Sequence, residues 1–462
     1  MLSFFDRHRR IGRRDFLTVG SLGLGGLSLP GLLRAADADQ GIVRDKAVIF
    51  VFLHGGPSQY ETFDPKMSAP VEVRSTTGEI ATSVPGLTFG GTFPRLASLA
   101  DRLSIVRSFR SGDGNHDIKP IVARSTANAN LGSLYARLAG VNHPRTNLPR
   151  NVAIFPRAVD DRAQGPVTSF GNFASTGHLG GAYAPFIPGG SGEAQQNMIL
   201  QLERDRFDDR RGLLSGLDRL QREVDALGSI NGLDRFQEQA FTTILGGVAE
   251  AFDLGQEERA TVEAYDTESR INVSEISRRW NNYDNYVDNA RSLGKLLLLA
   301  RRLCERGCGF AMVTTNFVWD MHSDVNNAGV EEGMQYMGWP LDHALGTLIE
   351  DLEQRGLSDK IQVVVTGEMG RTPRINGNGG RDHWGGLTPL LVYGGGTPGG
   401  QVIGHSSVDG GSPASEPIEL PHLVATVMHQ LLDVSKLRTL TGVPDEVLRA
   451  VTAAAPIPEL VG

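Results

Sequence analysis

Histidines and carboxylates in this sequence follow or precede expected strands, where side chains from separate segments can meet. His54 comes directly after an apolar run, and Asp320 and His322 lie just beyond a second one. Glu368 follows a third run, and His383 precedes a fourth. Imidazole nitrogen and carboxylate oxygen form the ligand set of metal sites that activate water. The sequence therefore predicts a divalent metal site built from these five residues, with zinc, manganese, iron or calcium left open as the ion.

Three further residues are candidates to act on a substrate held at such a site. His116, in the segment SGDGNHD, follows a short expected strand and could transfer a proton. Arg371 and Arg381 lie close to the metal-site candidates and could bind an anionic substrate through forked hydrogen bonds. This set suits hydrolysis of phosphate or sulfate esters. For each residue taken alone, an exposed histidine or a glutamate that caps a turn is the simpler alternative.

The elements that would position these side chains are predicted from runs of apolar residues. Continuous β-branched runs predict strands buried on both faces of a sheet, here over residues 46–53, 103–106, 151–155, 309–315, 361–366, 387–393 and 401–403. Helical spacing is expected over 92–101, 341–355 and 421–432. Alternating strands and helices imply a largely parallel sheet, whose ligands bind beyond the carboxyl ends of the strands. We therefore expect an α/β sandwich with a mostly parallel central sheet.

A different pattern fills residues 194–306, which carry long amphipathic stretches with charges on one face. They predict a packed helical insertion, and we assign no chemistry to it. Cys304 and Cys308 lie near its end, four residues apart. Two cysteines in 462 residues exclude a disulfide framework. We interpret both as packing residues, with a local disulfide as the alternative.

The first 38 residues resemble a twin-arginine export leader. Arg13 and Arg14 precede Asp15, and an apolar, glycine-rich run follows over residues 19–33. A transmembrane anchor is the alternative, but Pro30 and several glycines interrupt a run that is shorter than a span requires. We expect residues 39–462 to form a domain located in the periplasm or outside the cell, with membrane contact during export only.

Charge and motifs exclude several other classes of protein. The leader holds six arginines and three aspartates, so its removal changes the net charge from -8 to -11. This balance argues against a nucleic-acid partner. A serine hydrolase would need a G-x-S-x-G elbow, which is not present. The glycines at 394, 396 and 399 lead into another expected strand and not into a helix, which argues against a dinucleotide site.

The order of the motifs HGGPSQYETFDPK, NH, WDMH, GEMGRTP and GRDHW is similar to that of the DUF1501 family. In addition, the segment that ends in GEMGRTP resembles the helix, turn and strand that precede a metal-binding Asp-His pair in sulfatases and related phosphatases. The resemblance implies a three-layer alkaline phosphatase-like sandwich. It also implies an exported protein related to sulfatases, with a phosphate or sulfate ester of a small molecule or glycan as substrate.

The sequence departs from active members of that superfamily where their chemistry resides. His54 and glycines replace a metal-binding aspartate, and Glu368-Met369 replaces the Asp-His pair. No Cys-x-Pro-x-Arg motif occurs, and the matching region offers Ser111, Asn115 and His116. Two outcomes follow from the resemblance. Either a metal site has been rebuilt from the predicted ligands together with His116, or the protein is an inactive exported binding or scaffold protein on the same fold.

Overall fold

The computed structural model describes residues 4–6, 9–11, 41–189 and 248–461. Most of the predicted leader, and residues 194–247 of the predicted insertion, lie outside them. Within the leader, β1 (Phe4–Asp6) and β2 (Arg9–Ile11) form a short antiparallel pair. Among the described helices, none combines the length and the apolar character that crossing a membrane requires.

A seven-stranded sheet is the centre of the fold, with neighbouring strands in the order β14, β6, β13, β10, β3, β9, β8. All neighbours are parallel except those of β13, which is antiparallel to β10 and to β6. In chain order the strands are β3 (Ala47–Phe52), β6 (Leu103–Val106), β8 (Asn151–Ile154), β9 (Phe310–Thr314), β10 (Ile361–Thr366), β13 (Leu390–Gly394) and β14 (Gln401–Ile403). The expected α/β class with a mostly parallel sheet is confirmed.

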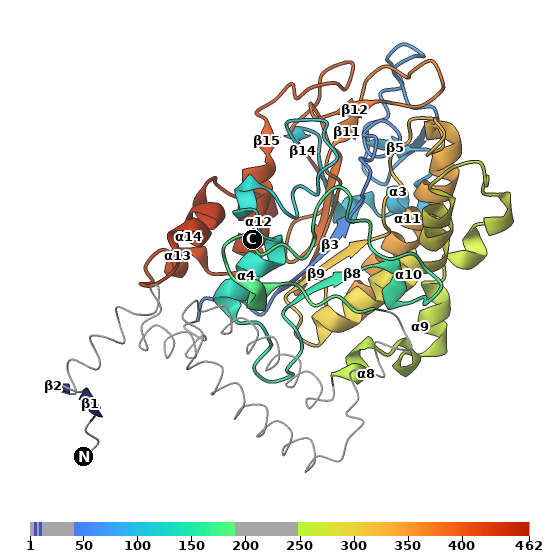
Figure 1. The fold of residues 1–462 in the computed structure, drawn as a ribbon. Coiled ribbons are helices and arrows are strands. Elements are labelled where there is room, and N and C mark those ends of the chain that lie inside the picture. The colour runs from blue at the N-terminus through green and yellow to red at the C-terminus, as the bar shows by residue number, and fades with distance from the viewer. Residues whose placement is uncertain (1–3, 7–8, 12–40, 190–247, 462) are drawn as a thin grey trace.

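Helices cover both faces of this sheet and give the molecule three layers (Figure 1). On one face lie α3 (Pro94–Ser98), α10 (Tyr283–Glu305) and α11 (Val330–Gln354). On the other lie α4 (Leu131–Ala139), α12 (Leu420–Leu431), α13 (Val434–Leu437) and α14 (Asp445–Thr452). Ile49 and Val51 of β3 belong to the first core, and Val48 and Phe50 to the second. This alternation explains why β3 appears in the sequence as an unbroken apolar run.

Two predicted boundaries were wrong for identifiable reasons. Helix α11 begins eleven residues before the expected start and continues through Pro340. Met334, Met337 and Leu341 are fully buried, and this apolar face offsets the hydrogen bond that a proline removes. Strand β13 begins at Leu390, after Pro389, which has no N–H to donate to a ladder.

Smaller elements complete the chain. Three two-stranded pairs are β4 (Glu79–Ala81) with β5 (Thr88–Gly90), β7 (Phe109–Arg110) with β15 (Ile418–Glu419), and β11 (Gly370–Arg371) with β12 (His383–Trp384). Short helices α8 (Ala249–Phe252) and α9 (Arg259–Ala264) precede α10. Helix α10 itself packs on the sheet, and Cys304 and Cys308 near its end are buried, free thiols.

Candidate metal centre

The loop after β3 holds the loop after β9 in place at the carboxyl end of the sheet. The backbone oxygen of His54 accepts hydrogen bonds from Val318 N and Trp319 N, both at 3.1 Å. Gly55 has a φ of +117°, and a Cβ there would lie 2.6 Å from the backbone nitrogen of Asp320. Only glycine permits this conformation and this approach. The two loops are therefore in direct contact, and Asp320 is fixed against the end of β3.

Four side chains from separate segments converge at this point, namely His116, Asp320, His322 and His383. One ligand atom from each lies within 4.8 Å of the ligand atoms of the others. The Nε2 atoms of His116, His322 and His383 lie 3.3, 3.0 and 3.3 Å from Asp320 Oδ1. Donors bound to one tetrahedral zinc ion are about 3.3 Å apart. The three distances to Asp320 Oδ1 therefore match the spacing of ligands on a single ion.

His116 has a buried ring nitrogen that faces the carboxylate of Asp320. Its Nδ1 lies 3.0 Å from Glu368 Oε1, and its buried Nε2 faces Asp320 without a hydrogen-bond partner. Burial opposes charging of the ring, but the nearby carboxylates of Asp320 and Glu368 raise the pKa of His116 above its usual value. With a proton on Nδ1 only, a lone pair would face a carboxylate oxygen. Either a second proton or a metal ion resolves that contact.

Asp320 is the hub of the cluster. Burial opposes its ionisation, but the contacts with the three histidines, together with Arg371, hold its pKa far below the usual range. Arg371 Nη2 lies 2.6 Å from Asp320 Oδ1, and Asn327 Nδ2 donates to Oδ2 at 3.1 Å. Asp320 is therefore an anion whose two oxygens are held in fixed directions.

Carboxylates also orient two of the histidines from behind. Glu368 accepts hydrogen bonds from Gly55 N and His116, and Asp382 Oδ1 lies 3.1 Å from His322 Nδ1. Asn376 Nδ2 donates to that same Asp382 oxygen. Such contacts fix a histidine's tautomer and raise its basicity as a ligand. Glu368, expected as a ligand, thus contacts a ligand candidate and is not a member of the group of four.

The charges around the cluster do not balance. Asp320, Glu368 and Asp382 supply three negative charges, and Arg371 supplies one positive charge. Hydrogen bonding to Asp320 favours the charged form of His383, but burial and the charges of Arg371 and His116 lower its pKa below the usual value. With neutral histidines, two negative charges remain in excess. A divalent cation would neutralise them.

His54, another expected ligand, is not part of the group of four. Its ring is fully buried, and both nitrogens lack a hydrogen-bond partner among the described residues. The rings of Phe317, Phe52, Phe173 and Phe170 surround it at centroid distances of 5.1, 5.4, 5.6 and 5.7 Å. Burial lowers the pKa of His54 to about 4. His54 is therefore a neutral ring enclosed by aromatic side chains. This environment agrees with its position directly after the apolar run of β3.

The two arginines expected to bind substrate are occupied by protein groups. Arg371 is fully buried and donates to Asp320 and to the backbone oxygens of Gly55, Gly56 and Arg381. In place of the predicted role of binding an anionic substrate, the structure supports a different role for Arg371, which is to hold Asp320 in position.

Arg381 lies in a separate ion pair with Glu61, and both side chains are fully buried. Its guanidinium also contacts the face of Tyr60, 4.2 Å from the ring centre, and donates to the backbone oxygen of Val73. Sequence reasoning missed Glu61, although it lies in the quoted segment HGGPSQYETFDPK. It also missed the orienting role of Asp382, which stands next to His383 in the motif GRDHW.

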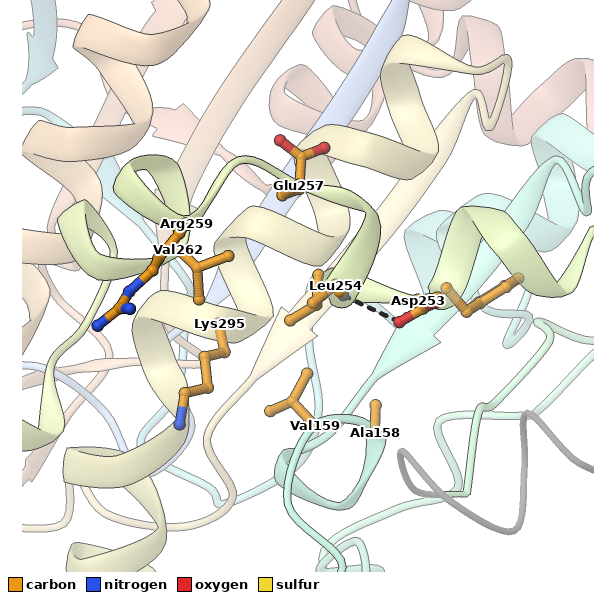
Figure 2. Close-up of a pocket in the computed structure, with 10 residues that line it drawn as sticks. Ala158, Val159, Asp253, Leu254, Glu257, Arg259, Val262 and Lys295 are labelled. Carbon is orange, nitrogen blue, oxygen red and sulfur yellow. Dashed lines mark hydrogen bonds between the residues drawn. The ribbon is translucent and has the colours of Figure 1, made fainter.

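Solvent reaches the centre from the side of two histidines. The side chains of His383 and His322 are 34% and 22% exposed, whereas those of His116 and Asp320 are 12% and 10% exposed. A cavity of about 470 Å³ elsewhere, beside α8, α9 and Lys295, contains none of these residues (Figure 2). The chemistry therefore does not coincide with that cavity, and access to the centre is from open solvent beside His383.

Fold and site together define an α/β protein with a histidine-carboxylate centre at the carboxyl end of its sheet. The chain belongs to DUF1501, described as a protein family of unknown function, whose model matches residues 45–460. No curated protein matches the sequence.

Similar solved structures include a PsFucS1 sulfatase from Pseudoalteromonas sp., with 13% identity over 86% of this chain and 69% of that one, at a TM-score of 0.35. A phosphonate monoester hydrolase from Silicibacter pomeroyi has 12% identity over 83% and 73%, at 0.31. The lipoteichoic acid synthase LtaP from Listeria monocytogenes has 10% identity over 84% and 72%, also at 0.31. With so little identity, the activities of these proteins are not transferred to this chain.

Proposed function

We propose that this protein is an exported hydrolase of phosphate or sulfate esters that depends on one divalent metal ion. The observation that carries the proposal is the convergence of three histidine nitrogens on one oxygen of Asp320, in a cluster that has two excess negative charges when the histidines are neutral. Three nitrogen ligands and one oxygen ligand favour a transition metal such as zinc, manganese or iron over calcium, which takes oxygen ligands.

A bound ion would supply Lewis-acid chemistry, because it polarises ester oxygens and lowers the pKa of water. The chain's own residues would hold that ion and keep its surroundings fixed. Glu368 and Asp382 orient His116 and His322. Arg371 fixes Asp320 while its other donors contact backbone oxygens and, from Nη1 at 3.2 Å, His322 Nε2. His383 lies beside solvent, so an anionic ester would approach from its side.

A binding protein without hydrolytic activity is the second candidate, and two observations favour it. Both arginines expected to hold an anionic substrate donate to protein oxygens. In addition, Ser111, a hydroxyl in the region where relatives carry their nucleophile, contacts Thr388 and Asp113 O. Metal binding without ester hydrolysis would therefore indicate a metal-dependent binding protein.

Metal content and hydrolysis separate these candidates. The protein, purified without chelator, should contain about one transition metal ion per chain by elemental analysis. Aryl phosphate and aryl sulfate esters are then tested with zinc, manganese, iron and calcium. His322→Ala and His383→Ala should lose the metal. His178→Ala, which changes an exposed histidine outside the group of four, should retain it.

Each result of this experiment has a consequence. Metal with hydrolysis supports the proposal, and metal without hydrolysis of either ester class supports the binding protein. A chain without metal, or one that retains it in both histidine variants, would refute the assignment of the centre.

We propose that the twin-arginine leader directs this export. Replacing Arg13 and Arg14 by lysine should leave the protein in the cytoplasm, as measured by cell fractionation with antibody detection. Continued export of the double variant would exclude the twin-arginine route.

A further inference from the structure

The amino-terminal edge of the sheet contains a second place where side chains from separate segments gather. A cavity of about 430 Å³ lies there, lined by the starts of β3, β8 and β10 and by the end of α10. Lys46, Arg150 and Lys360 each stand directly before one of these parallel strands. Parallel strands bring their first residues to one edge, so three basic residues meet at this cavity.

The lining is strongly positive although the chain as a whole carries a net charge of -8. Arg44 and Arg145 add two more cations, and Asp45 is the single carboxylate in the lining. Asp45 Oδ1 lies 2.9 Å from Lys360 Nζ, so it offsets one of five positive charges. The side chains of Arg44 and Arg145 are exposed, and neither forms an ion pair within the described part of the chain.

Arg150 is the most unusual of these residues because it is buried without a carboxylate. It is 8% exposed, and its guanidinium donates to Asn142 O at 3.4 Å and to the Tyr135 hydroxyl at 3.2 Å. The hydrogen bonds found for the guanidinium among the described residues come from Nε and Nη1, and Nη2 is not one of the buried atoms that lack a partner, so it is open to solvent. A buried cation normally has an anionic partner, because leaving water is costly. The cavity beside it is the available place for that anion.

A neutral donor close to Arg150, the ring of His143, completes the lining. His143 Nδ1 accepts a hydrogen bond from Thr146 N at 3.2 Å, which assigns the ring proton to Nε2. Burial lowers the pKa of His143, and the charges of Arg150 and Arg145 lower it further. The ring is thus a neutral donor in a positive field.

We propose that this cavity is a binding site for a small organic molecule that carries a phosphate or sulfate group. Arg150 is the buried anchor, since its fork matches two oxygens of such an anion. Arg145 and Lys360 contribute charge from the rim. The cavity is larger than a single inorganic oxyanion, which leaves space for an organic part. The site lies at the edge of the sheet opposite the metal centre and is independent of it.

Inorganic phosphate and sulfate are suitable probes, with titration calorimetry as the measurement and sodium chloride at matched ionic strength as the reference. The His383→Ala variant is titrated alongside, to exclude binding at the metal centre. Binding should persist in that variant. Arg145→Gln should weaken phosphate binding by about fivefold, which is the scale of one partly screened charge. Arg150→Lys should weaken it by about tenfold, because the forked contact is lost.

Arg374→Gln provides the matched control, since Arg374 is an exposed arginine at the other edge of the sheet. It should bind phosphate as the unaltered protein does. If Arg150→Lys fails to fold, Arg145→Gln still decides the matter because its side chain is exposed. The proposal would be overturned if neither phosphate nor sulfate bound, or if His383→Ala abolished binding. It would also be overturned if Arg145→Gln and Arg374→Gln bound phosphate with equal affinity.

Discussion

The two edges of the central sheet differ in the charge that they gather. At the carboxyl edge, Asp320, Glu368 and Asp382 surround three histidines and leave an excess of negative charge. At the amino edge, five basic side chains share one carboxylate, and Arg150 is buried without a carboxylate partner. The same parallel sheet therefore presents a candidate cation site at one edge and a candidate anion site at the other. Its strand direction separates them, because each strand contributes its first and last residues to opposite edges.

Buried arginines show this contrast most clearly. Arg381 lies near the carboxyl edge with its charge matched by Glu61, and both side chains are fully buried. Arg150 has neutral oxygens only as partners. Comparing substitutions at these two positions tests whether the amino edge is built for an external anion.

The largest effect is expected from Arg381→Met. It leaves Glu61 as a buried, unpaired carboxylate, so the free energy of unfolding should fall by about 3–5 kcal/mol. Urea unfolding followed by circular dichroism measures this change. Arg374→Met, in a largely exposed pair with Glu72, should change it by less than about 1 kcal/mol. Equal losses in the two variants would contradict the matched burial of Arg381 and Glu61.

A smaller effect is expected at the carboxyl edge from Glu368→Gln. This change weakens the contact that orients His116, so metal affinity should fall by about 10- to 100-fold. Competition with a chromophoric chelator provides the measurement. Asp382→Asn, at a carboxylate that is 59% exposed, should lose less affinity. A larger loss of metal affinity in Asp382→Asn than in Glu368→Gln would show that the exposed carboxylate contributes more to metal binding than the buried one.

The effect of Arg150→Met should be smaller again and different in kind. A methionine removes the buried charge while filling similar space, so without phosphate the free energy of unfolding should stay within about 1 kcal/mol of its original value. The added stability that phosphate gives to the unaltered protein should disappear in the variant. Thermal unfolding with and without phosphate tests both statements. A loss as large as that in Arg381→Met would show that Arg150 is already paired inside the protein.

The smallest effect concerns the pH dependence of stability at the amino edge. Because the pKa of His143 is lowered, the unfolded chain binds this proton more readily than the folded chain. The folded state should therefore lose stability as the pH falls below about 6.5, and the effect should be absent above it. His143→Asn keeps an acceptor for Thr146 and removes the titration. The difference between the two proteins in urea unfolding should thus grow from about pH 7.5 to about pH 5.

Phosphate offers a further test of the same residue. An anion beside Arg150 and Arg145 should raise the pKa of His143, which proton NMR of the imidazole ring can follow. A pKa that does not move with phosphate would place the anion away from this ring.

Local sequence patterns determined most of the fold. The runs that became β6, β10 and β14 were predicted to the residue. For β6 and β10 the reason is that a strand buried on both faces is largely apolar throughout. The same patterns placed the chemistry beyond the carboxyl ends of strands. Where boundaries failed, as at Pro340 of α11, long-range burial of an apolar face outweighed a local signal.

Tertiary structure alone decided which of the polar residues meet. Sequence reasoning grouped His54 with the ligands, yet aromatic rings enclose it, and three of these rings come from distant loops. It also treated Arg371 and Arg381 alike, whereas one holds Asp320 and the other pairs with Glu61. The physical reason is that strand and helix signals depend on neighbours along the chain. The direction of a side chain in a loop depends on hydrogen bonds and packing between segments that lie hundreds of residues apart.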